Sequence, residues 1–170
     1  MSTQALVPVQ DYLCGSWSPD LEYVDGVLVE RNVGEKDHSK VQRALLECLQ
    51  RYRADNLHAW PEQRVQVKSG RFRIPDVCIT VGEPDEQVFT RPPLACIEIL
   101  SPRDTLESVQ EKVTDYLQFG VPYVWLINPR TREAHNCTGG SLIRAADVLE
   151  TAASGSHPHL RIDLAGLFLL

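Results

Sequence analysis

The sequence predicts an α/β fold in which helices flank a mixed central β-sheet. A strand-like run at residues 94–100, a helical pattern over 105–119 and an apolar run at 121–127 follow one another directly. Strand, helix and strand in this order form a crossover unit, so the strands at 95–100 and 123–127 should be parallel neighbours. An apolar run as continuous as the last one is typical of a strand that is covered on both faces.

The N-terminal half adds further strands and a second helix. The segment LEYVDGVLVE at 21–30 contains two strand-like runs around an Asp-Gly pair, which predicts a β-hairpin near the N-terminus. From about 35 to 56, apolar residues recur at helical spacing. The segments RVQVK and RFRIPDVCITV, joined by a Ser-Gly pair, predict a second hairpin.

The helix expected over 105–119 has its own start and stop signals. Asp104 and Glu107 resemble a capping box, and Gly120 stands where a helix commonly ends. Beyond residue 130 the sequence predicts edge strands and a short terminal helix.

Length and composition limit the class of protein. The 170 residues, 43% of them hydrophobic, are enough for one domain with a proper core, and we expect a single domain over 1–170. No apolar run reaches the ~20 residues that span a bilayer, and the N-terminus has no signal-peptide pattern. Five cysteines lack any CxxC spacing, and Cys48, Cys78 and Cys96 fit apolar patterns, which indicates a reducing compartment and hence the cytoplasm.

Net charge bears on possible partners. The chain carries a formal charge of −6, whereas proteins that bind nucleic acid usually present a basic surface. Binding to DNA would therefore need a locally basic groove.

Glu98 interrupts the apolar stretch LACIEILSPRD at 94–104. A buried, ionised carboxylate without a partner costs several kcal/mol, so some group must balance it. Side chains alternate across a strand, which places Glu98 on one face with Cys96 and Leu100. On the strand expected at 72–81, Asp76 shares a face with Cys78 in the same way.

Asp76 and Glu98 should converge if their strands are neighbours. Two close carboxylates either share a proton or hold a cation, and hard oxygen ligands suit Mg²⁺ or Mn²⁺. Lys112 borders the buried face of the next helix, and its stem can bring the ammonium group to both acids. Two acids, a metal ion and a lysine form a site that can hydrolyse phosphodiesters.

A purely structural interpretation of the same residues stays open. Asp76 could accept a hydrogen bond from a backbone N–H in a turn, and Lys112 could be an exposed helix lysine.

Six segments in order extend the pattern beyond these residues: LEYVDGVLVE, DHSKVQRALLECL, PEQRVQV, RIPDVCI, IEILSPRD and EKVTDYLQFGVPYVWLINP. In order and spacing they resemble the Uma2 (DUF820) family of bacterial endonucleases in the PD-(D/E)XK nuclease superfamily, over roughly residues 20–130. The resemblance implies a restriction-endonuclease-like core, hydrolysis of DNA and a divalent metal, Mg²⁺ or Mn²⁺.

The resemblance also implies roles for single residues. Asp76 matches the metal-binding aspartate of the PD motif, and Glu98 matches the acid of the (D/E)XK motif. Leu100 stands where the superfamily has its lysine, and Lys112 matches the lysine that Uma2-like proteins carry on the following helix. Asp76, Glu98 and Lys112 are thus the expected catalytic residues, and Asp76 and Glu98 the expected metal ligands.

Glu22, His38 and Glu62 also fall at positions where the family has similar residues. His38 borders the apolar face of its helix, so a core or capping histidine is an alternative to a ligand. The predicted function is a Mg²⁺-dependent endonuclease, expected as a homodimer because a two-fold axis suits cleavage of both DNA strands. Two alternatives stay open: a degenerate nuclease fold that only binds or scaffolds, and a metal-dependent hydrolase of another substrate.

Overall fold

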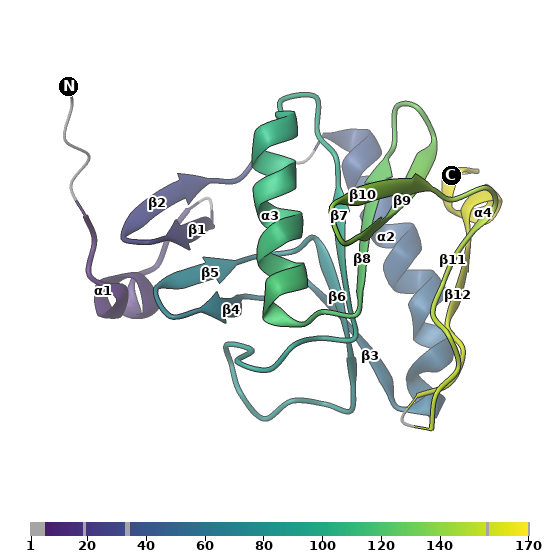
Figure 1. Cartoon of the computed structure of the whole chain (residues 1–170), viewed down its shortest axis with the longest axis horizontal. Coiled ribbons are helices and arrows are strands. Elements are labelled where there is room, and N and C mark those ends of the chain that lie inside the picture. Colours follow the sequence, from purple (N-terminus) through teal and green to yellow (C-terminus); the bar gives the residue numbers. More distant parts are fainter. Residues whose placement is uncertain (1–5, 19, 33–34, 156, 170) are drawn as a thin grey trace.

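The computed structural model describes residues 6–18, 20–32, 35–155 and 157–169. Its centre is a six-stranded sheet with helices on both faces (Figure 1). In spatial order its strands are β10 (Ser141–Arg144), β9 (Glu133–Thr138), β8 (Tyr123–Asn128), β7 (Ala95–Ile99), β6 (Val77–Val81) and β3 (Leu57–Pro61). The predicted crossover is confirmed, because β7 and β8 pair in parallel around the intervening helix.

A second sheet of four strands lies beside the first. Its order is β2 (Val27–Glu30), β1 (Leu21–Val24), β5 (Arg71–Arg73) and β4 (Val65–Lys68). The predicted N-terminal hairpin is β1–β2, whose turn residues Asp25 and Gly26 both have positive φ, 50° and 96°. This geometry matches the turn type that an Asp-Gly pair favours.

The remaining elements are helices and a small two-stranded sheet. The α-helices are α1 (Val9–Cys14), α2 (Lys36–Leu49), α3 (Leu106–Phe119) and α4 (Leu164–Phe168), and a 3₁₀ helix, Gln50–Asp55, extends α2. Strands β11 (Val148–Glu150) and β12 (Arg161–Asp163) form the third sheet. No helix in the described part of the chain has the length and apolar character needed to cross a membrane.

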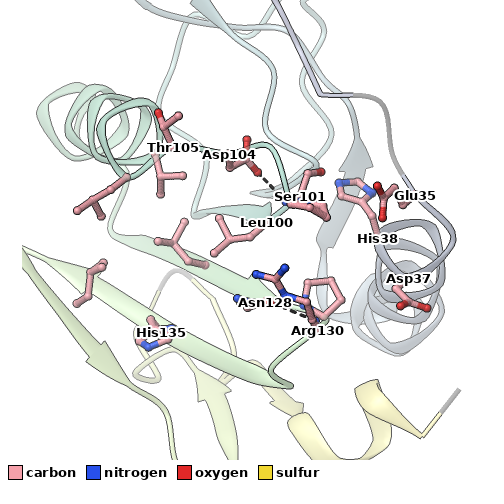
Figure 2. A pocket seen from close by; sticks show the side chains of 16 residues that line it. Glu35, Asp37, His38, Leu100, Ser101, Asp104, Thr105, Asn128, Arg130 and His135 are labelled. Atoms are coloured by element: carbon pink, nitrogen blue, oxygen red, sulfur yellow. Dashed lines mark hydrogen bonds between the residues drawn. The ribbon is translucent and has the colours of Figure 1, made fainter.

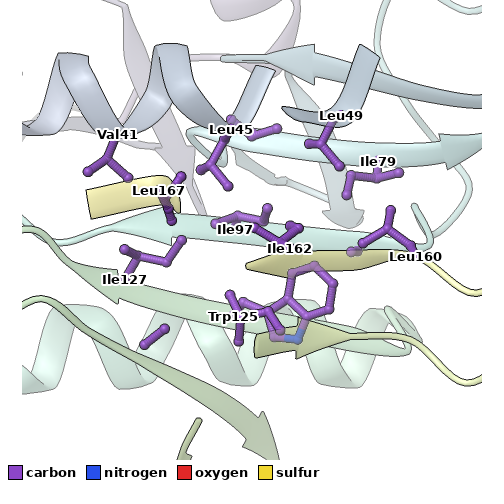
Figure 3. Close-up of a cluster of buried hydrophobic side chains, with 14 of the residues drawn as sticks. Val41, Leu45, Leu49, Ile79, Ile97, Trp125, Ile127, Leu160, Ile162 and Leu167 are labelled. Carbon is purple, nitrogen blue, oxygen red and sulfur yellow. The ribbon is translucent and has the colours of Figure 1, made fainter. Parts of the chain in front are cut away.

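The two faces of the six-stranded sheet are buried under different elements. Figure 3 shows Val41, Leu45 and Leu49 of α2 packed over Ile79, Ile97 and Ile127, with side chains of β12 and α4 in the same cluster. Helix α3 covers the opposite face, where Val113 and Tyr116 pack on Cys78 and Cys96. The side chains of β7 alternate between these layers, so Glu98, on the face of Cys96, lies on the α3 side.

One strand expected from the sequence is divided in two. The run at 72–81 is β5 up to Arg73 and β6 from Val77, and these strands belong to different sheets. Pro75, which has no N–H to donate to a ladder, lies in the break. Asp76 is therefore a junction residue just before β6 rather than a residue within a strand.

The start of α3 also differs from the prediction. Thr105 is the N-cap and forms a capping box with Ser108, while Asp104 accepts hydrogen bonds from the Ser101 N–H and the Asn32 side chain. Gly120 ends the helix at a φ of 98°, as predicted. The cap lies one residue later than expected because Asp104 is engaged by the preceding turn.

Candidate active site

Glu98 on β7 lies against two side chains of α3. Its Oε2 is 3.1 Å from Lys112 Nζ, and its Oε1 accepts a hydrogen bond of 2.6 Å from the Tyr116 hydroxyl. Lys112 and Tyr116 are four residues apart and so share a helix face. The prediction that Lys112 points at Glu98 is confirmed, and the alternative of a solvent-exposed lysine is wrong.

Asp76 has a different set of partners. Its Oδ1 lies 3.0 Å from an Arg31 guanidinium nitrogen and 3.3 Å from His38 Nε2, and its Oδ2 accepts a 2.7 Å hydrogen bond from the Ile99 N–H. The open alternative of a backbone hydrogen bond is thus realised, although the donor lies at the end of β7 rather than in a turn.

The strand register brings the two acids into one region. Val77, directly after Asp76, pairs with Ile97, directly before Glu98. Asp76 also accepts a hydrogen bond from the N–H of Ile99, directly after Glu98. The two carboxylates are not left to face each other unpaired, because each has a cationic side chain of its own.

Glu22 completes this cluster from the second sheet. It is 1% exposed, with Oε1 lying 3.3 Å from Lys112 Nζ and accepting a hydrogen bond from the Ile74 N–H, and with Oε2 2.8 Å from Arg73. Lys112 therefore bridges Glu98 and Glu22. The sequence selected Glu22 only through its family position, and the structure places it within the charged cluster.

Burial and neighbouring charges separate the pKa values of the acids. Burial, with the charges of Asp76 and Glu22, raises the pKa of Glu98 to about 7, although Lys112 and Tyr116 act in the opposite direction. Burial alone would also raise the pKa of Asp76, but His38, the Ile99 N–H and Arg31 together hold it below its usual range. For Lys112, burial is outweighed by Glu98 and Glu22, so the pKa of the ammonium is raised.

His38 and Glu62 both contact Asp76, one at its carboxylate and the other at its carbonyl oxygen. His38, in the first turn of α2, is buried and contacts the Asp76 carboxylate, so it is a buried histidine with a polar partner and not a helix cap. Glu62 follows β3 at a φ of 50°, is exposed, and donates its N–H to the Asp76 carbonyl oxygen.

A cleft opens next to this cluster, where β7 and β8 end. Its volume is about 290 Å³, and Figure 2 shows His38, Ser101 and Thr105 on one side and Asn128 and His135 on the other. Among the described residues, His38 is the one that both lines the cleft and contacts Asp76. Asp76 and Glu98 are buried and do not line the cleft, so the cleft is linked to Asp76 through His38.

The sequence did not reveal every member of the site. Arg31 gave no signal because it lies outside any periodic segment, 45 residues from its partner Asp76. Tyr116 falls at an apolar position of its helix, but its place four residues after Lys112 was available as a signal. Arg73 and Asp115, 2.7 Å apart, were also missed.

A family model matches most of the chain. Residues 10–158 match the Uma2 family, described as “Putative restriction endonuclease”. The chain belongs to the Uma2 family. No match is found among curated proteins.

Solved structures support the fold of this Uma2 protein. A crystal structure described as “a putative nuclease belonging to DUF820 from Anabaena variabilis ATCC 29413” matches with a TM-score of 0.78 and 19% identity, over 95% of this chain and 97% of that chain. At this identity the likeness shows the fold, which confirms the predicted fold class. A “DrdV-DNA complex” aligns over 79% of this chain and 12% of that chain, with 17% identity and a TM-score of 0.42, too low to carry an argument.

Proposed function

We propose that this Uma2 protein is a metal-dependent endonuclease that hydrolyses phosphodiester bonds of DNA, with Asp76, Glu98 and Lys112 as its catalytic residues. The observation that carries the proposal is the 3.1 Å contact between Lys112 Nζ and the buried Glu98 carboxylate. A lysine brought from a helix to an acid within a strand is costly to bury, and phosphodiester hydrolysis is a use for that arrangement.

The chemistry of the donors fits a hard divalent cation. Asp76, just before β6, and Glu98, on the neighbouring strand β7, offer carboxylate oxygens. Mg²⁺ or Mn²⁺ takes one or two protein carboxylates and completes its shell with water. Within the described residues, no group of three or more His, Cys, Asp or Glu side chains could hold a metal ion. We assign Asp76 and Glu98 to the proposed ion as its two carboxylate ligands; when bound, it would polarise a phosphoryl oxygen and activate water.

The protein's own residues prepare the site for a phosphodiester. Lys112 holds a fixed positive charge beside Glu98, where it stabilises charge that develops on the phosphate. Tyr116 fixes the orientation of the Glu98 carboxylate through Oε1. Glu22 holds Lys112 from its other side and keeps the ammonium protonated.

Nicking of a supercoiled plasmid tests the proposal. The wild-type protein should convert supercoiled plasmid to open circles in Mg²⁺ or Mn²⁺ and not in EDTA. Glu98→Gln and Lys112→Met, which keep side-chain size while removing charge, should each slow nicking by about 10²-fold or more. Wild-type protein without metal-dependent nicking would contradict the proposal, and undiminished nicking by Lys112→Met would remove the lysine from the mechanism.

One observation favours a second candidate, a nuclease fold that only binds or scaffolds. Both oxygens of each carboxylate already have partners: Arg31, His38 and the Ile99 N–H for Asp76, and Lys112 and Tyr116 for Glu98. A network of ion pairs that only stabilises the fold would show the same contacts. If the protein is a scaffold of this kind, it should not nick plasmid in the presence of any metal ion, whether or not it binds DNA.

We also propose a homodimer, because two copies related by a two-fold axis can cut both strands of a duplex. Sedimentation equilibrium of the purified protein measures this directly, and a monomer at working concentrations would contradict it.

A further inference from the structure

Arg31 pairs with a carboxylate oxygen of Asp76, one of the two proposed metal ligands. Its guanidinium lies 3.0 Å from Asp76 Oδ1, and its side chain is 14% exposed. A guanidinium group at this distance places a positive charge beside the carboxylate that the proposed metal ion would bind, so the two cations compete electrostatically for Asp76.

Arg31 is surrounded by negative charge. Burial alone would lower the pKa of the guanidinium, but the charges of Asp76, Glu98, Glu62 and Glu22 raise it. These include both proposed metal ligands, so Arg31 and a divalent cation would be attracted to the same small region.

Arg31 is better placed to move than Lys112, the other cation of the cluster. Lys112 projects from the middle of α3 and bridges two buried carboxylates, Glu98 and Glu22. Arg31 lies on the connection between β2 and α2, outside any helix or strand, and is held at one carboxylate. Asp76 retains His38 and the Ile99 N–H when Arg31 leaves.

We propose that Arg31 is a displaceable partner of Asp76 and a phosphate-binding residue. It pairs with Asp76 in the metal-free protein, gives up that position when the divalent cation binds, and then donates to a phosphate oxygen of the substrate. The inference rests on the proposed metal-dependent nuclease function. A guanidinium fork suits both anions, since it donates two hydrogen bonds to a carboxylate or to a phosphate.

Metal affinity and nicking should respond to Arg31→Met in opposite directions. Without Arg31, the cation no longer competes for Asp76, so the Kd for Mg²⁺ measured by calorimetry should fall by about tenfold or more. Nicking at saturating Mg²⁺ should nevertheless slow by at least about tenfold, because a contact to the phosphate is lost. Arg43→Met is the matched control: Arg43 also lies near the start of the chain, is 63% exposed and pairs with Glu47 on α2, so both values should stay as in the wild type.

A second measurement needs no activity and uses the wild-type protein. The Arg31 Nε–H signal in an NMR spectrum, assigned by its absence from Arg31→Lys, should shift during a Mg²⁺ titration with the midpoint of metal binding. An Arg31 signal that stays constant while Mg²⁺ binds would overturn the inference even if Arg31→Met fails to fold.

The outcomes separate the inference from the function on which it rests. If wild type and Arg31→Met bind Mg²⁺ equally tightly, or if tighter binding comes with unchanged nicking, the inference is wrong and the nuclease proposal stands. If neither protein binds a divalent cation, the metal-dependent function itself fails, and the inference fails with it. Tighter binding together with slower nicking supports both.

Discussion

Tyr116 falls at an apolar position of its helix, yet in the structure it is a hydrogen-bond partner of Glu98. Its ring is fully buried, and its hydroxyl donates a 2.6 Å hydrogen bond to Glu98 Oε1. A hydrogen bond to a charged group contributes about 1.5–3 kcal/mol, more than a bond between neutral groups. Tyr116→Phe should therefore lower the free energy of unfolding in urea by that amount, and should slow plasmid nicking because Glu98 loses its fixed orientation.

Tyr23→Phe is the control for this prediction. Tyr23 is also buried and donates a 2.7 Å hydrogen bond, but to the carbonyl oxygen of Val7, in a separate aromatic cluster with Tyr12 and Phe72. Removal of the Tyr23 hydroxyl should lower the free energy of unfolding by about 1 kcal/mol and leave nicking unchanged. If Tyr116→Phe were as active as Tyr23→Phe, the hydroxyl would have no role beyond stability.

Alternation along β7 was enough to place Glu98 on the face of Cys96, but not to predict which groups neutralise the two acids. Asp76 lies before β6 rather than within it, so alternation along that strand does not fix the direction of its side chain. The cation of Glu98 was predictable because Lys112 lies 14 residues away, on the next helix. The contact between Arg31 and Asp76 was not predictable, because it depends on the path that the chain takes after β2 past the junction of the two sheets.

At the scale of single elements, α3 sets the position of Lys112 and Tyr116, so its N-cap contributes indirectly to the site. Thr105 accepts a 3.1 Å hydrogen bond from the Ser108 N–H. Thr105→Ala should lower the free energy of unfolding by about 1 kcal/mol, the usual contribution of such a cap. Glu107→Ala should change it by less than about 0.5 kcal/mol, because Glu107 is exposed and is not the capping partner. If the two variants lost equal free energy of unfolding in urea, Glu107 would contribute to the cap, as expected from the sequence.

Element boundaries were harder to predict than element types. The apolar residues from Phe72 to Val81 suit one long strand, and nothing in their periodicity reveals that β5 and β6 belong to different sheets. Pro75 was the available signal for the break. Strand β3, with the sequence LHAWP, was missed because it has no β-branched residues and ends in proline, although it forms an edge of the central sheet.

At the scale of the whole molecule, buried ion pairs join the two larger sheets through α3. Arg73 of β5 lies 2.7 Å from Asp115 of α3 and 2.8 Å from Glu22 of β1. Arg71 pairs with Asp115 as well, at 2.9 Å. The network continues through Lys112 to Glu98 on β7, so the four-stranded sheet is coupled to the six-stranded sheet at the candidate active site.

This coupling bears on the prediction that residues 1–170 form one domain. Arg73 is 2% exposed, and two of its acidic partners, Glu22 and Asp115, are also buried, so Arg73→Met leaves part of their charge unbalanced. Breaking a buried ion pair from one side costs about 3–5 kcal/mol, and we expect a loss of that size in urea unfolding. Arg144→Met, which removes the more exposed pair with Glu133, should cost less than about 1 kcal/mol.

If the sheets form one cooperative unit, the wild-type protein unfolds in a single transition by circular dichroism and by Trp fluorescence. Two wild-type transitions, with only one of them moved by Arg73→Met, would show instead that the sheets unfold separately and that the one-domain prediction is wrong.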